Sequence, residues 1–180
     1  MLDLTKKKMP SAVEVGGILY PIHTDYRYYL NLDKILKKKD FQPSDIDFLF
    51  TTKKPLEKVA GVEALLDFYS PKRILPISSG ETSERVFDYM IDADLIYAAF
   101  YQVYKIDLID TDLHWWKFLA LFDGVIGTRF NDITGYRGFD PNDKTSYEQS
   151  MKNLKRAWAL PAEMNEEEKE DFDNFNKLFS

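Results

Sequence analysis

The sequence has no cysteine, only two histidines and no apolar run long enough to cross a membrane. Without cysteine there is no disulfide framework, no thiolate metal site and no cysteine nucleophile. The first 17 residues carry lysines, but they lack the apolar stretch that a signal peptide needs. We therefore expect a soluble, cytoplasmic protein with no membrane partner.

Motifs of enzyme chemistry are also scarce. His23 and His114 are far apart in the sequence, and neither has the nearby serine or acid that would define a catalytic triad. The stretch ISSGETSE at 77–84 has one glycine and no following lysine, so it does not match a phosphate-binding loop. These absences favour a protein that is not an enzyme and that needs no cofactor.

Two stretches place carboxylates close together, DLIDTDLH at 107–114 and DPNDKTSYE at 140–148. Helix caps and turns explain Asp110, Asp112, Asp140 and Asp143 more simply than a divalent ion does, and the second stretch lacks the glycine and the ligand spacing of a calcium loop. We therefore expect no metal. An enzyme that uses these carboxylates with a metal ion stays open as a weaker hypothesis.

The net charge of −6 is concentrated at the C-terminus. Residues 163–180 contain seven acidic and two basic residues, which gives −5 and leaves −1 for residues 1–162. No basic stripe is available to neutralise phosphates, so nucleic acid is not an expected partner. Phe172, Phe175 and Phe179 share one face of this tail, and that face either packs on its own domain or contacts a partner.

The 180 residues are 44% hydrophobic and rich in aromatic side chains, so they can form a sizeable core. We predict a mainly α protein with one helical domain over 13–161, preceded by a flexible N-terminus at 1–12. The domain begins with a β-hairpin over 13–24 around Gly16 and Gly17, with Pro21 on an edge strand. An acidic amphipathic helix over 162–180 follows, and 70–84 is the longest loop or a domain hinge.

Apolar residues at helical spacing predict the helices. The expected helices and their inward residues are 25–39 with Tyr28, Leu32, Ile35 and Leu36; 44–51 with a capping box of Ser44 and Asp47; a helix from Pro55 with Val59, Val62, Leu66 and Tyr69; 92–105 with Ala93, Ile96, Tyr97, Phe100, Val103 and Tyr104; 128–139 with Phe130, Ile133 and Tyr136; and 143–160 with Tyr147, Met151, Leu154 and Trp158.

The stretch DTDLHWWKFLALFDG at 110–124 predicts a helix that is apolar on most of its circumference. Asp110, Thr111 or Asp112 is the expected cap, and Gly124 is the expected end. One apolar stripe contains Trp115, Phe118, Leu119 and Phe122, and another contains Leu113, Trp116 and Ala120, which leaves His114 and Lys117 as the polar sector. Such a helix must be covered on both sides, so we expect a central helix with at most one face free for a partner.

Several motifs in order resemble one known family. VFDYMIDADLIYAAFYQVYKIDL at 86–108 is followed by LHWWKFLALFDG at 113–124 and TRFNDITGYRGFD at 128–140, and this series is similar to the core of the bacteriophage gene-product-fifteen family of Gram-positive siphophages and prophages. VEVGGILYPIHTDYR at 13–27 and KNLKRAWALP at 152–161 extend the resemblance over 13–161. Lys105 departs from the pattern, because a glycine is common there.

The resemblance implies a protein of the phage tail module, encoded between the major tail protein and the tape-measure protein. This is the position of tail assembly chaperones, so we expect a non-enzymatic chaperone in the host bacterial cytoplasm that binds the tape-measure or the major tail protein before assembly. A structural tail component retained in the virion is the alternative, and homo-oligomerisation is possible in both cases. The residues that we expect to bind the partner are His114, Trp115, Trp116, Lys117, Phe118, Phe172 and Phe175. For the residues of this set that lie on the helix, burial in the core is the stronger expectation.

Overall fold

The computed structural model describes residues 2–71, 85–140 and 146–161. It is mainly α-helical with one short hairpin near the N-terminus, which confirms the predicted fold class. The chain divides into two compact units, one formed by residues 1–83 and 89–132 and the other by residues 84–88 and 133–180. None of the described helices is long and apolar enough to span a membrane.

The hairpin lies where the two glycines predict it. Strand β1 (Ala12–Val15) pairs antiparallel with β2 (Ile18–Pro21), and Val13 lies opposite Tyr20. Gly16 and Gly17 have φ values of 57° and 79°. Residues with a Cβ adopt this backbone conformation only with a steric penalty, which glycine avoids. The backbone N–H of Thr51 donates to the carbonyl of Pro21 at 3.0 Å, so the end of β2 is also bonded to the segment that follows η1.

Helix α1 (Tyr26–Leu36) begins at the predicted cap and ends three residues before the predicted Lys39. The carboxylate of Asp25 accepts the N–H of Arg27 at 3.0 Å, as an N-cap does. The buried face is formed by Tyr26, Tyr29 and Leu32. The predicted stripe was therefore only partly correct, because Tyr28 is half-buried and stacks on His23 at the edge of this face.

The segment between α1 and α2 differs from the prediction in its caps. A 3-10 helix, η1 (Pro43–Leu49), replaces the expected helix 44–51, and its capping box is formed by Gln42 and Asp45 instead of Ser44 and Asp47. Pro43 at the start of η1 fixes the backbone one residue earlier than Ser44 would. The predicted capping pair was therefore wrong, although a short helix does form here.

Helix α2 (Lys58–Tyr69) has a buried face that agrees only in part with the predicted one, since Val62, Leu66 and Tyr69 are half-buried at its sides. Gly61, Leu65 and Phe68 are buried, whereas Val59 is 66% exposed. Pro55 is not the first helical residue; it is buried against Gly61, where an added Cβ would lie 2.6 Å from its ring. The glycine allows this close approach and so decides which face of α2 packs.

Helix α3 (Ala93–Tyr104) confirms the predicted segment, with Asp92 as its N-cap residue. It buries Ile96, Ala99 and Phe100, and it ends at Lys105, which has a left-handed φ of 57°. This conformation favours glycine, which is the residue common at this position in the family that the sequence resembles.

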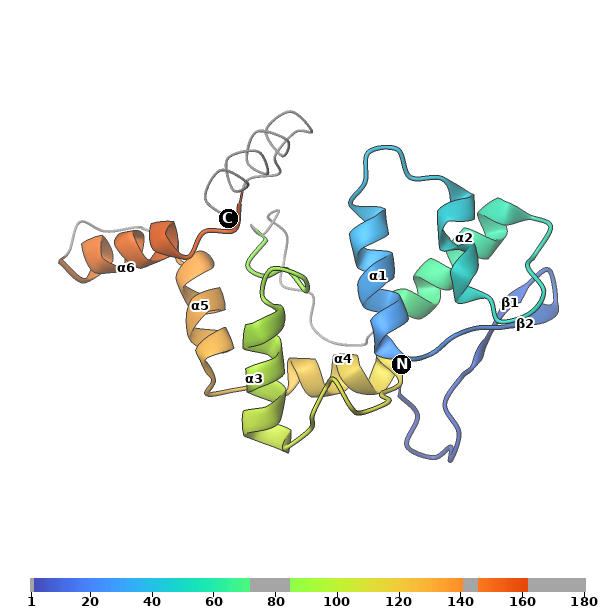
Figure 1. The fold of residues 1–180 in the computed structure, drawn as a ribbon, viewed down its shortest axis with the longest axis horizontal. Helices are drawn as coiled ribbons and strands as arrows, with labels where there is room; N and C mark the ends of the chain where they lie inside the picture. Colours follow the sequence, from blue (N-terminus) through green and yellow to red (C-terminus); the bar gives the residue numbers. More distant parts are fainter. Residues whose placement is uncertain (1, 72–84, 141–145, 162–180) are drawn as a thin grey trace, which may run out of the picture. The chain divides into compact units, whose positions relative to one another are not determined.

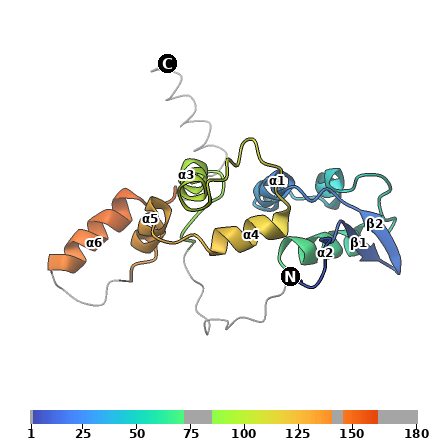
Figure 2. The same ribbon diagram turned by 90° about the horizontal axis from the view of Figure 1, so that it is seen from below.

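Helix α4 (Trp115–Asp123) ends at Gly124 as predicted. It begins later than expected, because His114 is the N-cap residue instead of Asp110, Thr111 or Asp112. Figures 1 and 2 show α4 running from the start of α1 to α3. Its rings stack on Tyr29 of α1, Tyr69 of α2 and Phe100 of α3. The prediction of a central helix is confirmed for the first unit.

Helix α5 (Arg129–Arg137) begins in the first unit and ends in the second, and Phe130 and Ile133 are buried as predicted. In the second unit, the guanidinium of Arg137 donates to the carbonyls of Trp158 at 2.6 Å and Val86 at 3.1 Å. These bonds tie the chain after helix α6 (Ser146–Ala157) to the short segment before α3.

The prediction of the inward face of α6 was partly wrong. Tyr147, expected in the core, is 68% exposed, and the neighbouring Glu148 is buried, with its carboxylate 2.6 Å from Lys152. The predicted loop or hinge at 70–84 lies almost entirely outside the described residues, as does the predicted tail helix. The flexible N-terminus and the extent of the single domain stay predictions.

The close contact at Gly61 gives a first test. Replacing Gly61 with Ala is expected to lower the free energy of unfolding by about 1–3 kcal/mol, because the new methyl group overlaps Pro55. Gly135→Ala is the matched control: its Cβ meets nothing within 4 Å, so this change is expected to be neutral or stabilising. Urea unfolding followed by tryptophan fluorescence measures both, and equal effects would contradict the packing described here.

Candidate partner-binding site

The two adjacent tryptophans at the start of α4 bind the end of α2. The indole N–H of Trp115 donates to the carbonyl of Tyr69 at 2.7 Å, and that of Trp116 donates to the carbonyl of Phe68 at 2.9 Å. The last carbonyls of a helix have no partner within the helix, and leaving such groups buried without one is costly. The tandem tryptophans therefore satisfy the C-terminus of α2 from a neighbouring helix.

Trp115 is a core residue. Its side chain is 1% exposed, and its ring lies between those of Tyr29 at 5.3 Å and Tyr69 at 5.4 Å. The hydroxyl of Tyr69 donates to Asp33 at 2.8 Å, and burial, together with this bond, raises the pKa of Tyr69. The expected contact of Trp115 with a partner is thus corrected: the same ring fills the centre of the first unit.

Phe118 is buried in the same way, also at 1% exposed. It stacks on Tyr26 at 4.8 Å and on Phe100 at 5.1 Å, which joins α1, α4 and α3 through three rings. The hydroxyl of Tyr26 donates to the carbonyl of Leu108 at 2.6 Å. Phe118 is therefore unavailable to a partner, and sequence spacing alone does not distinguish such a core ring from a surface ring.

His114 caps α4 with its ring. Its Nδ1 accepts the backbone N–H of Trp116 at 3.1 Å, so the proton of the neutral ring lies on Nε2, which donates to the carbonyl of Pro10 at 2.9 Å. Burial lowers the pKa of His114, and the positive charge of Lys117 lowers it further. These two bonds satisfy both ring nitrogens of His114 within the protein.

A small cavity, here called the Trp116 cavity, lies beside the remaining accessible part of Trp116. Its volume is about 280 Å³, and it is lined by Leu2, Asp3, Lys6, Lys8, Met9, Pro10 and Trp116. The bond between His114 and Pro10 holds the N-terminal segment 2–10 next to α4. Of the predicted α4 residues, the half-buried His114 and Trp116 and the exposed Lys117 thus remain accessible; Phe172 and Phe175 lie outside the described residues.

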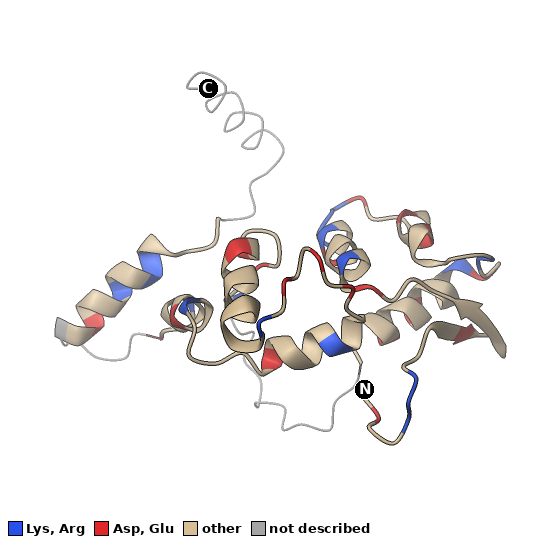
Figure 3. Ribbon diagram, turned by 60° about the horizontal axis from the view of Figure 1, so that its bottom comes forward, with Lys and Arg blue, Asp and Glu red and all other residues tan. Residues whose placement is uncertain are grey.

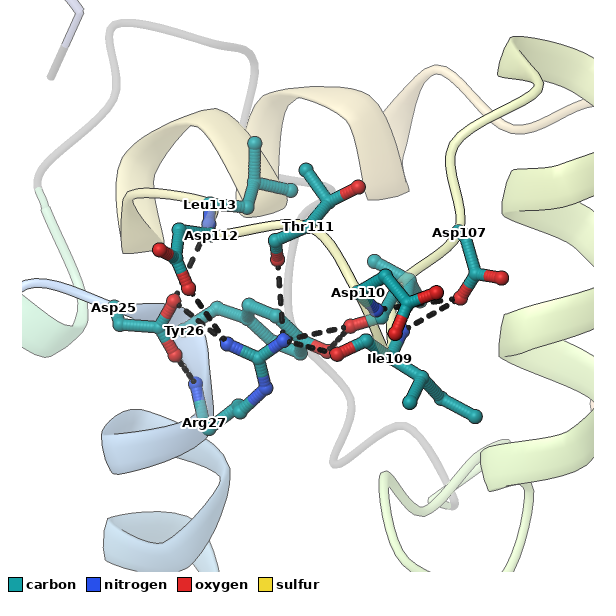
Figure 4. A network of polar contacts seen from close by, with 10 residues as sticks. Asp25, Tyr26, Arg27, Asp107, Ile109, Asp110, Thr111, Asp112 and Leu113 are labelled. Atoms are coloured by element: carbon teal, nitrogen blue, oxygen red, sulfur yellow. Dashed lines mark hydrogen bonds and ion pairs between the residues drawn. The ribbon is translucent and has the colours of Figure 1, made fainter.

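Arg27, which the sequence analysis did not identify, joins α1 to the loop before α4 (Figure 4). Its guanidinium donates to the carbonyls of Leu108 at 3.0 Å, Ile109 at 2.7 Å and Thr111 at 3.2 Å, and it pairs with Asp25 at 3.1 Å. A basic residue in the first turn opposes the helix dipole. Arginine at this unfavourable position is the feature of the sequence that could have indicated partners elsewhere in the fold.

The beginnings of α1 and α4 also exchange backbone bonds. The N–H of Tyr26 donates to the carbonyl of Leu113 at 2.9 Å, and the N–H of Trp115 donates to the carbonyl of Thr24 at 2.7 Å. Asp25 accepts the N–H of Leu113 as well, at 3.2 Å. Each helix start is thereby capped by the residues that precede the other helix.

Three apolar side chains on α3 and on the loop after it, here called the Tyr101 surface, are half-buried or exposed: Tyr97, Tyr101 and Ile109. Tyr101 is 52% and Ile109 is 74% exposed, and the rings of Tyr97 and Tyr101 stack at 6.4 Å. Asp107 accepts the hydroxyl of Tyr97 at 3.1 Å and the N–H of Ile109 at 2.9 Å, so it fixes both ends of the surface. Lys105 Nζ lies 5.9 Å from the ring centroid of Tyr101 and supplies a charged rim.

The carboxylates of 107–114 bind the protein itself. Asp107 accepts backbone N–H groups, and Asp112 lies 3.4 Å from the Arg27 guanidinium. Within the described ranges, no three His, Asp or Glu side chains come close enough together to hold a metal ion. Asp107 and Asp112 thus have partners within the protein, although Asp112 is not the helix cap that the sequence predicted.

The His114 cap gives a pH prediction. Because the folded pKa lies below the ordinary 6.5, the unfolded chain binds the proton more readily. The stability that the neutral ring contributes is fully present above about pH 6.5 and is lost as the pH falls toward the folded value. His114→Asn keeps a capping acceptor that does not titrate.

We therefore expect the wild type to lose more free energy of unfolding than His114→Asn between about pH 7.5 and pH 5.5. Urea unfolding at each pH measures the two losses. The two proteins differ only at position 114, so the difference between their losses reports on that side chain. Identical pH profiles would show that the ring does not act as described.

The Arg27 network gives a second prediction. Arg27→Lys is expected to lower the free energy of unfolding by about 1–3 kcal/mol, because one ammonium cannot replace the guanidinium donors to three carbonyls. Asp112→Asn is the control; its side chain is 99% exposed, and the expected change is within about 0.5 kcal/mol. Thermal or urea unfolding tests both, and a neutral Arg27→Lys would contradict the assignment.

The chain is similar to one family of phage proteins. A family described as "Bacteriophage Gp15 protein" matches residues 5–160 of the chain. No curated protein and no solved structure matches it. The matched range contains the tandem tryptophans, the Arg27 network and the Tyr101 surface.

Proposed function

The chain belongs to the bacteriophage Gp15 protein family, and from this membership we propose that it is a non-enzymatic phage tail assembly factor. It acts as a chaperone in the host bacterial cytoplasm and binds the tape-measure protein, or the major tail protein, before the tail assembles. The resemblance described above, which implies a gene in the tail module, supports this role.

The observation that carries the proposal is the Tyr101 surface. A chaperone for a long helical chain must cover apolar faces and later release them, which requires a shallow apolar surface with a polar rim instead of a deep apolar groove. Tyr101 and Ile109 provide exposed apolar area, Lys105 lies near the Tyr101 ring, and Asp107 binds the N–H of Ile109. Asp107 holds the surface in shape before a partner binds.

The partner is expected to contact the Tyr101 surface more than the start of α4. Trp115 and Phe118 are buried, so of the predicted α4 residues the half-buried His114 and Trp116 and the exposed Lys117 remain accessible. An interface usually depends on a few aromatic or aliphatic anchors. Tyr101 and Ile109 satisfy this requirement. A substitution of Lys117 tests the alternative that the partner binds the start of α4, as the sequence predicted.

The test is co-expression with the tape-measure protein of the same phage, scoring its solubility and co-purification. The wild type is expected to keep the tape-measure protein soluble and to co-purify with it. Tyr101→Ser with Ile109→Ser is expected to reduce the co-purified amount at least about fivefold. The matched control is Leu56→Ser with Ile126→Ser, two other exposed apolar side chains, 98% and 76% exposed, whose loss is expected to have no effect.

Each other result has a defined meaning. A tape-measure protein that stays insoluble with the wild type contradicts the chaperone proposal, and the polypeptide in purified virions would support the structural tail component instead. Loss with Lys117→Glu but not with the Tyr101 and Ile109 changes would move the interface to α4. Melting curves of every variant separate loss of binding from loss of fold.

A further inference from the structure

The Trp116 cavity has room for one aromatic or branched aliphatic side chain. Its volume is about 280 Å³, whereas a cavity of about 150 Å³ already holds a benzene ring and sites for drug-sized molecules usually begin at about 300 Å³. Leu2, Met9, Pro10 and Trp116 form its apolar part. Trp116 donates its indole N–H to the carbonyl of Phe68 and stacks on the Phe68 ring at 5.0 Å, so this wall is in place before a ligand binds.

The rim of the cavity is basic. Residues 2–10 contain three lysines and one aspartate, which gives a net charge of +2, and Figure 3 shows these lysines in the segment before β1. Lys6 and Lys8 line the cavity, and Asp3 lies 3.6 Å from Lys6 and offsets part of its charge. Lys8 is exposed and, among the residues that the structure describes, pairs with no acidic side chain. The rim therefore favours an anionic ligand.

The backbone that carries these lysines has hydrogen-bond donors to spare. The segment before β1 is tied to α4 by the bond between the carbonyl of Pro10 and the ring of His114. In the described ranges, the N–H groups of Lys7, Lys8 and Met9 donate to no other group of the protein. An extended peptide brings a carbonyl at every residue that can accept such donors. The backbone here therefore favours a peptide over a compact small molecule.

We propose that the Trp116 cavity binds an acidic peptide segment of a partner protein, with one large apolar side chain of that segment inserted against Trp116. The carboxylates that flank the inserted side chain then lie against Lys6 and Lys8, and the peptide backbone accepts N–H groups of the segment before β1. This inference goes beyond the proposed function and does not depend on it, because the residues of the Tyr101 surface take no part in it.

Nucleic acid, the other common anionic partner of lysines, fits this cavity less well. Proteins that bind single strands stack successive bases on several aromatic side chains. Among the described residues that line the cavity, Trp116 is the only aromatic one, and its ring already stacks on Phe68.

The first experiment labels the full-length chain with 5-fluorotryptophan and follows it by ¹⁹F NMR. The Trp116 resonance is assigned by its loss in Trp116→Phe. The probe is a synthetic peptide of sequence DDFDD, blocked at both ends, and it is expected to shift the Trp116 resonance with a dissociation constant below about 1 mM. The matched control peptide DDSDD has the same charge but no ring, and it is expected to leave the resonance in place. Equal shifts with both peptides, or no shift with DDFDD up to about 5 mM, would overturn the proposal.

The second experiment tests the lysine rim with the DDFDD peptide. Lys6→Glu with Lys8→Glu is expected to weaken its binding at least about fivefold at low salt, and added salt is expected to weaken binding to the wild type. Lys38→Glu with Lys39→Glu, an equal change of charge at two exposed lysines, is the control. Equal weakening by the two pairs would contradict the proposal, because the attraction would then be only net charge.

An oligothymidylate with the same net charge as DDFDD separates the two classes of anionic partner. It is expected to leave the Trp116 resonance in place, and tighter binding of the oligothymidylate than of DDFDD would replace the peptide by nucleic acid. Melting curves of the lysine variants separate loss of binding from loss of fold. Co-purification of the tape-measure protein is measured separately, so failure here leaves the chaperone proposal unaffected, and the reverse also holds.

Discussion

The packing of the first unit depends on two indole N–H groups that bind the last carbonyls of α2. Trp115 and Trp116 occupy consecutive positions and therefore point to different sides of α4, yet both donate to the same helix end. The Trp115 ring also stacks on Tyr29 of α1 and on Tyr69 of α2. One helix end, two rings and three helices are thus fixed together.

The start of α4 is fixed equally tightly. His114 supplies the cap, Thr24 accepts the N–H of Trp115, and Asp25 accepts the N–H of Leu113. Arg27 then binds the carbonyls of the intervening loop. The region with the most aromatic residues is therefore devoted to the core, and any surface that meets a partner must be built from what remains outside it, such as the Tyr101 surface and the Trp116 cavity.

Much of the fold was predictable. Helical periodicity located the six α-helices of the described residues, and Gly16 with Gly17 located the hairpin, because these signals depend only on neighbouring residues. The caps and inward faces were less predictable. Gln42 forms the capping box with Asp45 because Pro43 begins η1 one residue earlier than expected, and Pro55 packs closely against Gly61 of α2. His114, instead of Asp110, Thr111 or Asp112, caps α4, and its ring also bonds to Pro10, which lies far away in the sequence. For the candidate site, periodicity found the α4 residues but could not say which of them were buried.

The sequence by itself determined the fold class, the family and the concentration of negative charge in residues 163–180, because each follows from residue identity and local spacing. Only the tertiary structure decided that Trp115 and Phe118 belong to the core while Tyr101 and Ile109 face outward. It also decided that Arg27 binds the carbonyls of the loop before α4 and that His114 caps α4. These outcomes depend on which faces of separate helices meet, and that information is spread over residues far apart in the chain.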